Sequence, residues 1–398
     1  MHTIDPIAPL SLVLADCAES VAVERTLWEL ATRLPRDRYD VRVWLASDPA
    51  KNPLAEALES RAIAVDRLPA PGATWGVRGL LQTWSRLRRA KPRLLHLHFT
   101  WPSHDGVSRS LTEMAGVPHR IVSAHGGRTP ETSRGATRSA VERTDVVTTS
   151  CELFADQLVR ETGLSRDRIR RIPAGIDEFD TEFEAERAQD IRQALDAGMH
   201  RPLWVFAGRL DQHRGAATLV EALGIARERG TPFVAAIAGE GPDRLVLEQR
   251  IEELSLGNRV SVLDPGHELA QDVGALLAAA DAVIAPSLWD GMSSVMLQAL
   301  VRGRPVVASA VGGAPDAIEN GVSGRLVPPG DARALADALA SFQERADLAA
   351  RLGREAARRS RDVYVWPRVV EAYEGVYDEV LGLASFAPEV TAVARGRW

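Results

Sequence analysis

The chain has 398 residues, of which 45% are hydrophobic and 26% are charged. This composition is typical of a globular protein of about two or three domains, and it excludes a disordered chain, a collagen-like repeat and a small disulfide-rich scaffold. The formal net charge is -6 at pH 7, so the chain has no overall positive field that would hold DNA or RNA. Nucleic acid is therefore not an expected partner.

The two cysteines, Cys17 and Cys151, lie far apart and outside any C-x-x-C pattern. Such a pair cannot build a disulfide framework or a thiolate metal cluster, and we expect both thiols to be buried and reduced. The first twenty residues place no Lys or Arg before their short apolar run, and no stretch elsewhere is long enough to span a membrane. These features predict a cytoplasmic protein.

Short apolar runs rich in β-branched residues alternate with longer amphipathic segments, which is typical of parallel sheets covered by helices. The predicted strands are 11–15, 41–46, 94–98, 120–124 and 145–150, followed by 202–207, 233–239, 259–263, 281–287, 305–309 and 324–328. A charged segment separates the two series, and strong helix formers follow residue 333. The pattern therefore predicts two successive α/β domains, whose ligands bind at the carboxyl ends of the strands.

The strand at 202–207 runs directly into Gly208, Arg209 and Leu210, and Arg214 precedes a helical segment. A glycine lets backbone approach a ligand, and two guanidinium groups near a helix start can clamp an anion. The alternative is that both arginines are solvated cations, although cations are disfavoured at a helix N-terminus without an anion. The pattern predicts a phosphate or diphosphate site.

The next strand ends in Gly239, Glu240, Gly241 and Pro242. The third glycine of a dinucleotide fingerprint is replaced by Arg244, so this pattern gives little support for NAD. It favours a tight turn from strand to helix.

The segment 284–313 carries Asp290 and Gly291 after a buried strand. Ser293 and Ser294 are the expected caps of a helix that starts at about Val295 and holds Gln298 in its first turn. Asp290 and Gln298 can accept hydrogen bonds from sugar hydroxyls, and the free N–H groups of the helix start can bind a phosphate.

The motifs GRLDQHRG, GEGP, DGMSSVMLQAL, GRPVVAS and NGVSGRLVPPGD follow one another in this order. Residues 200–381 resemble the nucleotide-binding domain of retaining GT-B glycosyltransferases, namely glycosyltransferase family 4 (glycosyl transferases group 1). The resemblance implies an α/β GT-B fold of two Rossmann-like, doubly wound domains that face each other across a cleft. It divides the chain into an acceptor-binding domain (1–185), a nucleotide-sugar-binding domain (186–365) and a C-terminal helix (366–398) that packs back on the N-terminal domain.

The resemblance implies a metal-independent hexosyltransferase without a cofactor. This enzyme would transfer a sugar, with retention, from a nucleotide diphosphate sugar to a hydroxyl acceptor in polysaccharide or glycoconjugate biosynthesis. A UDP-sugar is the favoured donor, and the acceptor is a glycan, a lipid-linked glycan or a small metabolite. It assigns catalytic roles to Arg209, Arg214 and Asp290. It assigns donor contacts to Gly208, Gly239, Gly241, Gly291, Met292, Ser293, Ser294, Val295 and Gln298. The first half resembles the family's acceptor-binding domain less sharply, and there the catalytic strand-loop histidine of the family falls on His125, for which the alternative is a purely structural role.

Two features of the first half leave alternatives open. His96 and His98 share one face of a strand, where a metal pair is geometrically possible, but no third ligand is identifiable and inward packing is expected. The basic segment 84–93 is either a solvated helix face or a peripheral contact with anionic lipid at the inner membrane face.

The sequence also departs from the family pattern. Val21 and Ala22 replace glycines, Arg214 replaces a lysine, Ala174 replaces an asparagine, and Asp290 and Gln298 replace the two glutamates of a Glu-x7-Glu motif. Gln298 keeps an acceptor but loses the charge, and a charged hydrogen bond is about twice as strong as a neutral one. These changes motivate an alternative, a catalytically silent GT-B scaffold that acts as a binding or partner subunit. An oxidoreductase with a nucleotide cofactor is a third hypothesis, although the chain lacks a full Gly-x-Gly-x-x-Gly pattern.

Overall fold

The computed structural model of the protein describes residues 10–14, 21–46, 53–68, 84–86, 88–99, 116–125, 141, 144–177, 179, 181–198 and 200–383. They form two compact units. Unit 1 contains the described residues up to Ala174 together with residues 366–383, and unit 2 contains the described residues from Gly175 to Val365. Unit 2 therefore starts before residue 186, where the sequence analysis placed its start, because helix α7 (Thr181–Ala194) packs on helix α10 (Val273–Ala279).

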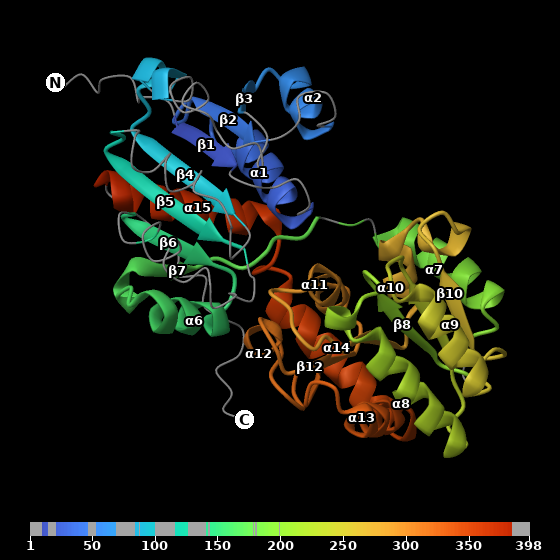
Figure 1. Ribbon diagram of the computed structural model, residues 1–398. Coiled ribbons are helices and arrows are strands. Elements are labelled where there is room, and N and C mark those ends of the chain that lie inside the picture. Colours follow the sequence, from blue (N-terminus) through green and yellow to red (C-terminus); the bar gives the residue numbers. More distant parts are fainter. Residues whose placement is uncertain are drawn as a thin grey trace. The chain divides into compact units, whose positions relative to one another are not determined.

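Unit 1 is built on a parallel sheet with the strand order β3-β2-β1-β4-β5-β6-β7 (Figure 1). Its strands are β1 (Leu10–Leu14), β2 (Val41–Ala46), β3 (Ala64–Leu68), β4 (Leu94–Phe99), β5 (His119–Ala124), β6 (Val146–Thr149) and β7 (Ile169–Arg171). Its helices are α1 (Val21–Arg33), α2 (Pro53–Ser60), α6 (Glu152–Thr162), the 3-10 turn η2 (Arg166–Arg168) and α15 (Trp366–Leu381).

Both faces of this sheet are buried, because neighbouring residues of a strand point to opposite sides. Leu94 packs in one core with α1 and α15, whereas its neighbour Leu95 packs in another core with α6. Ile121 and Val122 divide in the same way on β5. Helix α15, drawn in red in Figure 1, therefore lies against strands that are far from it in the sequence.

Unit 2 is built on a second parallel sheet with the order β10-β9-β8-β11-β12-β13. Its strands are β8 (Leu203–Ala207), β9 (Val234–Ala238), β10 (Val260–Leu263), β11 (Ala282–Ala285), β12 (Val306–Ser309) and β13 (Arg325–Val327). Besides α7 and α10, its helices are η3 (Gln212–Arg214), α8 (Ala216–Glu228), α9 (Arg244–Glu253), η4 (Glu268–Ala270), α11 (Ser294–Val301), α12 (Ala314–Ala317), α13 (Ala332–Glu344) and α14 (Ala346–Ser360).

Each strand expected from the sequence is present, so the prediction of two parallel α/β domains is confirmed. The sequence pattern does not predict β3 and β7, which are the two outer strands of the first sheet. Edge strands are short and carry polar side chains, as AVDRL and IRR do, and they lack the apolar run that marks a central strand.

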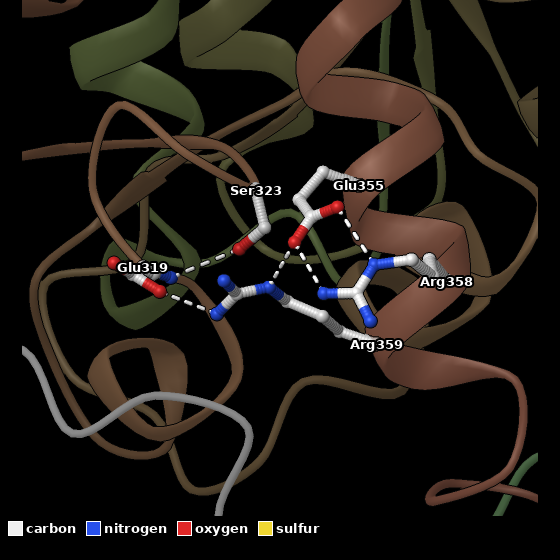
Figure 2. A network of polar contacts seen from close by, with 5 residues as sticks. All are labelled: Glu319, Ser323, Glu355, Arg358 and Arg359. Carbon is white, nitrogen blue, oxygen red and sulfur yellow. Dashed lines mark hydrogen bonds and ion pairs between the residues drawn. The ribbon is translucent and has the colours of Figure 1, made fainter.

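A polar network anchors the segment between α12 and β13 to helix α14 (Figure 2). The Arg359 guanidinium pairs with Glu319 on that segment and donates to Glu355 at 2.6 Å on its own helix. The two guanidinium groups of Arg358 and Arg359 lower the pKa of Glu355 to about 2. Ser323 closes the segment on itself, because its Oγ accepts the Glu319 N–H at 3.0 Å.

A buried ion pair joins α7 to the chain after α11. The Arg302 guanidinium donates to the two carboxylate oxygens of Glu184 at 2.9 and 2.5 Å, and their side chains are only 7% and 10% exposed. Arg302 also lies over the Phe179 ring, 4.2 Å from its centroid. The pair therefore fixes α7 on unit 2.

We expect Glu184→Ala to destabilise unit 2 by about 3–5 kcal/mol, because it leaves the Arg302 guanidinium buried without its carboxylate. Hydrogen exchange of peptides from α7 and α11 would measure the loss as weaker protection. The matched control is Glu186→Ala, an exposed change on the same helix, which should alter stability by no more than about 0.5 kcal/mol. Equal protection in the two variants would contradict this account of the pair.

Candidate functional site

The loops after β8 and β11 form the centre of the candidate site in unit 2. β8 and β11 are neighbouring parallel strands, so their carboxyl ends lie at the same edge of the sheet. The His213 carbonyl accepts the Leu288 N–H at 2.8 Å and thereby joins the two loops. Gly215 completes the contact. It has a φ of +72°, and a Cβ at this position would lie 1.9 Å from the Pro286 carbonyl oxygen.

Arg214 and Asp290 come together at this edge as an ion pair. The same carboxylate accepts the Gly291 N–H at 2.8 Å and the Ser287 Oγ–H at 3.2 Å. The Asp290 side chain is 12% exposed, whereas that of Arg214 is 40% exposed. Asp290 thus holds the arginine in place, and the remaining guanidinium N–H groups of Arg214 stay available at the surface.

Arg209 is largely in solvent, with 69% of its side chain exposed, and its Nε lies 3.4 Å from an oxygen of Asp211. Asp211 also caps η3 by accepting the Arg214 N–H at 3.1 Å. Two arginines near a helix start predict an external anion, but Asp211 and Asp290 already supply carboxylates to both arginines. The arginine pair alone therefore does not require a bound phosphate.

The N-terminus of α11 lies directly after this loop. Ser293 is the cap, since its Oγ accepts the Met296 N–H at 3.3 Å, as the sequence predicted. Two other predictions for this helix are wrong: Ser294 is the first helical residue and not a cap, and Gln298 lies in the second turn. The backbone N–H groups of Ser294 and Val295 donate no hydrogen bond within the described residues. They are the donors that a helix start offers to an anion.

The glycines after β9 hold two loops together. Gly239 has a φ of +153°, and a Cβ on it would lie 1.9 Å from the Gly208 carbonyl oxygen. A Cβ on Gly241 would come within 2.2 Å of the Leu210 carbonyl oxygen. The tight turn favoured by the sequence is therefore present, and it lies directly against the loop that carries Arg209. Contacts of these glycines, and of Gly291 and Met292, with a donor stay predictions.

In unit 1, polar side chains line the sheet face that α15 covers. His98 Nδ1 lies 3.0 Å from His125 Nε2, and His98 Nε2 lies 3.2 Å from His96 Nδ1. The Tyr377 hydroxyl on α15 is 2.8 Å from the same His96 nitrogen, and Ser123 Oγ is 2.7 Å from His96 Nε2. His96 and His98 are completely buried, so the predicted inward packing is confirmed. Nothing in the sequence pointed to Tyr377, which is 281 residues from His96.

Burial lowers the pKa of all three imidazoles. The pKa values of His96 and His98 fall well below their usual range, and that of His125 falls to about 4. All three rings are therefore neutral at pH 7. His125 is partly exposed just after β5, so it can hydrogen-bond a ligand but carries no positive charge for a phosphate. Gly126 and Gly127, which follow it, lie outside the described residues.

Other predictions concern the periphery of the protein. Cys151 is buried, as expected, whereas Cys17 lies outside the described residues. In the basic segment 84–93, the Arg88 guanidinium stacks 4.7 Å from the centroid of the Trp84 ring. Peripheral membrane contact by this segment stays a prediction. Within the described chain, no helix is both long enough and apolar enough to cross a membrane, and no cluster of three or more His, Cys, Asp or Glu has the arrangement of a metal site.

Val21 and Ala22 are the first two residues of α1, and Ala174 is a partly exposed residue at the end of unit 1. These positions therefore occupy loop and helix ends, where the family pattern has glycine or asparagine.

We expect unit 1 to lose stability as the pH falls from 7 to 5. The unfolded imidazole of His125 titrates near pH 6.5 and the folded one at about 4. Between these values the unfolded chain binds the proton and the folded chain does not, so acid lowers the free energy of unfolding. The loss at pH 5 is about 2 kcal/mol from His125 alone, and His96 and His98 act in the same direction.

Hydrogen exchange of β4 and β5 peptides at pH 7 and 5, corrected for intrinsic rates, would measure this loss. The matched control is His200→Gln, an exposed change in unit 2. In this variant the exchange protection of the β4 and β5 peptides should depend on pH as it does in the wild type. Protection of β4 and β5 that stays constant with pH would show that the three rings are not buried in the neutral form.

Two family models cover most of the chain. Residues 23–178 match the model described as Glycosyltransferase Family 4, and residues 188–359 match Glycosyl transferases group 1. Among curated relatives, the D-inositol 3-phosphate glycosyltransferase of Saccharomonospora viridis is 30% identical over 321 residues, which are 76% of this chain and 74% of the relative. The alpha-D-kanosaminyltransferase of Streptomyces kanamyceticus is 26% identical over 84% of this chain and 94% of its own.

Solved structures agree on the fold. HepE from Anabaena in complex with UDP has a TM-score of 0.77 at 20% identity, covering 93% of this chain and 100% of HepE. WaaG, a glycosyltransferase involved in lipopolysaccharide biosynthesis, has a TM-score of 0.64 at 16% identity, covering 94% and 100%. These neighbours are GT-B proteins, and the two parallel Rossmann-like sheets described above are the units of that fold. With the fold, both family models and the Saccharomonospora relative in agreement, the chain belongs to glycosyltransferase family 4.

Proposed function

We propose that this protein is a retaining glycosyltransferase that moves a sugar from a UDP-sugar to a hydroxyl acceptor. The proposal of a donor site rests on one observation. In unit 2, the exposed guanidinium group of Arg209 and the partly exposed one of Arg214 belong to the loop after β8. This loop contacts the loop leading to α11, where two backbone N–H groups have no partner among the residues that the structure describes. Guanidinium and free helix N–H groups together are suited to bind a diphosphate. Membership of the family favours this function over a catalytically silent scaffold.

The choice of UDP rests on similarity. HepE has been solved with UDP and with UDP-glucose, and we extend that donor class to this chain. Relatives act, by their names, on D-inositol 3-phosphate or in teichuronic acid biosynthesis. The proposed acceptor is therefore a hydroxyl group of a glycan, a lipid-linked glycan or a small metabolite, in polysaccharide or glycoconjugate biosynthesis.

In the proposed reaction, the bond between the anomeric carbon of the sugar and the diphosphate breaks, and a bond forms from that carbon to the acceptor oxygen. Negative charge develops on the leaving diphosphate. Arg209 and Arg214 stabilise that charge, while Asp290 and Asp211 hold the guanidinium groups in place beforehand. The donor's own β-phosphate takes the acceptor proton on the same face of the sugar, so no separate base, cofactor or metal ion is proposed. His125, neutral at pH 7, hydrogen-bonds a sugar hydroxyl.

We expect UDP to stabilise unit 2 and Arg209→Ala to remove most of that effect. A ligand at 100 times its dissociation constant adds about 2.7 kcal/mol of stability, which for a unit of this size raises the unfolding midpoint by about 5–10 °C. Thermal unfolding with UDP, GDP, ADP or TDP would show which nucleotide binds. The matched control is Arg229→Ala, which removes a surface arginine paired with Asp337 at the other end of α8 and should keep the UDP shift.

The outcomes separate the two functions. A UDP shift that depends on Arg209 supports a donor site, and a shift with another nucleotide alone would replace UDP as the donor. No shift with any of the four nucleotides would overturn the transferase proposal and favour a GT-B scaffold that serves as a binding subunit.

For a transfer reaction with an α-linked UDP-sugar, we expect an α-linked product and an unchanged rate in excess EDTA. The stereochemistry follows from attack on the same face of the sugar, and the EDTA result follows because arginine and backbone N–H groups are proposed to replace a metal at the diphosphate. NMR of the anomeric proton would identify the product. A β-linked product would exclude retention, and loss of activity in EDTA that added Mg²⁺ restores would exclude a metal-independent reaction.

A further inference from the structure

The ion pair between Arg214 and Asp290 joins two loops that other contacts already hold together. Gly215 packs so closely on the second loop that a Cβ would lie 1.9 Å from the Pro286 carbonyl oxygen. A backbone hydrogen bond of 2.8 Å joins the same two loops one residue before Arg214. The distance that the two side chains must span is therefore set by the backbone.

The loop of Asp290 is also held from its other side, by the residues that follow β12. The Gly313 N–H donates to the Gly291 carbonyl at 2.6 Å, and a Cβ on Gly312 would lie 2.3 Å from the carbonyl oxygens of Asp290 and Gly291. Arg214 is anchored by its own N–H, which donates at 3.1 Å to the carboxylate that caps η3. The backbone therefore has little freedom to absorb a change in the length of either side chain.

The lengths of the two side chains are matched to this span. Arginine carries its terminal nitrogens one bond farther from Cα than lysine does, and aspartate carries its oxygens one bond nearer to Cα than glutamate does. Arg214 and Asp290 stand where the family pattern has lysine and glutamate, so the two replacements together leave the summed length of the pair unchanged. Either replacement alone would make the pair one bond too long or too short.

The carboxylate of Asp290 is committed to contacts within the protein. One oxygen pairs with the Arg214 guanidinium and accepts the Ser287 Oγ–H at 3.2 Å, and the other accepts the Gly291 N–H at 2.8 Å. A carboxylate offers about four acceptor sites, and the Asp290 side chain is only 12% exposed. Little acceptor capacity is therefore left for a sugar hydroxyl.

We propose that Asp290 is a positioning residue for Arg214 and not a binding residue for the sugar, and that the two replacements form one length-compensated change that preserves the site. This inference rests on the proposed function for the identity of the ligand, whereas the matching of the pair is a property of the protein alone. Arg214 presents the guanidinium donors that do not face Asp290 to a phosphate oxygen. Two departures from the family pattern are then one contact, and they do not indicate a silent scaffold.

The test is a double-mutant cycle of Arg214→Lys, Asp290→Glu and the two together, in the full chain without ligand. Hydrogen exchange of the Leu288 and Gly313 amides reports how firmly the loops are held. We expect each single variant to lower their protection about three- to tenfold, because a charged hydrogen bond of a partly exposed pair is lost. In the double variant the summed length is restored, and protection should return to within about twofold of the wild type.

Two outcomes would overturn the matching of the pair. In one, the double variant loses protection by the product of the two single losses, as independent residues would. In the other, both single variants keep the protection of the wild type. The matched control is the same cycle at Arg229 and Asp337, an ion pair of α8 and α13 in which the aspartate is 59% exposed. Those substitutions should change the protection of the Leu288 and Gly313 amides by less than about twofold.

Ligand binding separates positioning of Arg214 from a direct contact with the sugar. Asp290→Asn keeps the shape of the side chain but removes the charge that holds the guanidinium, so we expect it to weaken UDP and UDP-glucose by the same factor, about tenfold. The matched control, Asp337→Asn, should leave both affinities unchanged.

Because UDP lacks the sugar, the two ligands distinguish the roles of Asp290. Unchanged UDP affinity in Asp290→Asn, together with weaker UDP-glucose binding, would overturn the proposal and assign Asp290 to the sugar. Failure of the wild type to bind UDP would overturn the proposed function, and the double-mutant cycle would still decide whether the pair is matched.

Discussion

Parallel pairing of the strands is the constraint on which both candidate sites depend. Every strand pair in the two sheets is parallel, so the loops that follow neighbouring strands leave from the same edge. β8 and β11 are neighbours, and this brings Arg214 and Asp290 into contact although 76 residues separate them. The contact is close enough to require a glycine at position 215, because a side chain there would collide with Pro286.

The same constraint arranges the polar groups of unit 1. β4 pairs with β5 in a register that sets His98 opposite Ser123, and the period of two along each strand turns both toward α15. Helix α15 joins unit 1 from the far end of the sequence and places the Tyr377 hydroxyl 2.8 Å from His96 Nδ1, beside this row of rings. The C-terminal helix therefore completes the polar interior of unit 1 as well as its apolar core.

The sequence predicted what depends on local pattern and failed where distant residues meet. Central strands were predicted because burial on both faces requires an apolar run, whereas the edge strands β3 and β7 tolerate charged residues and were missed. Ser293 was recognised as a cap from its place before the helix. The contact between Arg214 and Asp290 was not recognised, nor was the link between Tyr377 and His96. Both depend on the order of strands and on helix packing, neither of which leaves a local sequence signal.

The carboxylates beside the arginines also change how the proposed donor would be held. Asp211 and Asp290 offset the charges of Arg209 and Arg214, so the loop offers little net positive charge to an approaching diphosphate. Recognition must therefore come from directed N–H groups, namely the remaining guanidinium donors and the backbone N–H groups of Ser294 and Val295. These donors are already oriented, because Asp290 fixes Arg214 and Ser293 caps α11. Donors that are already oriented stabilise developing charge without rearranging during the reaction. This suits a site where negative charge is proposed to develop on the leaving diphosphate.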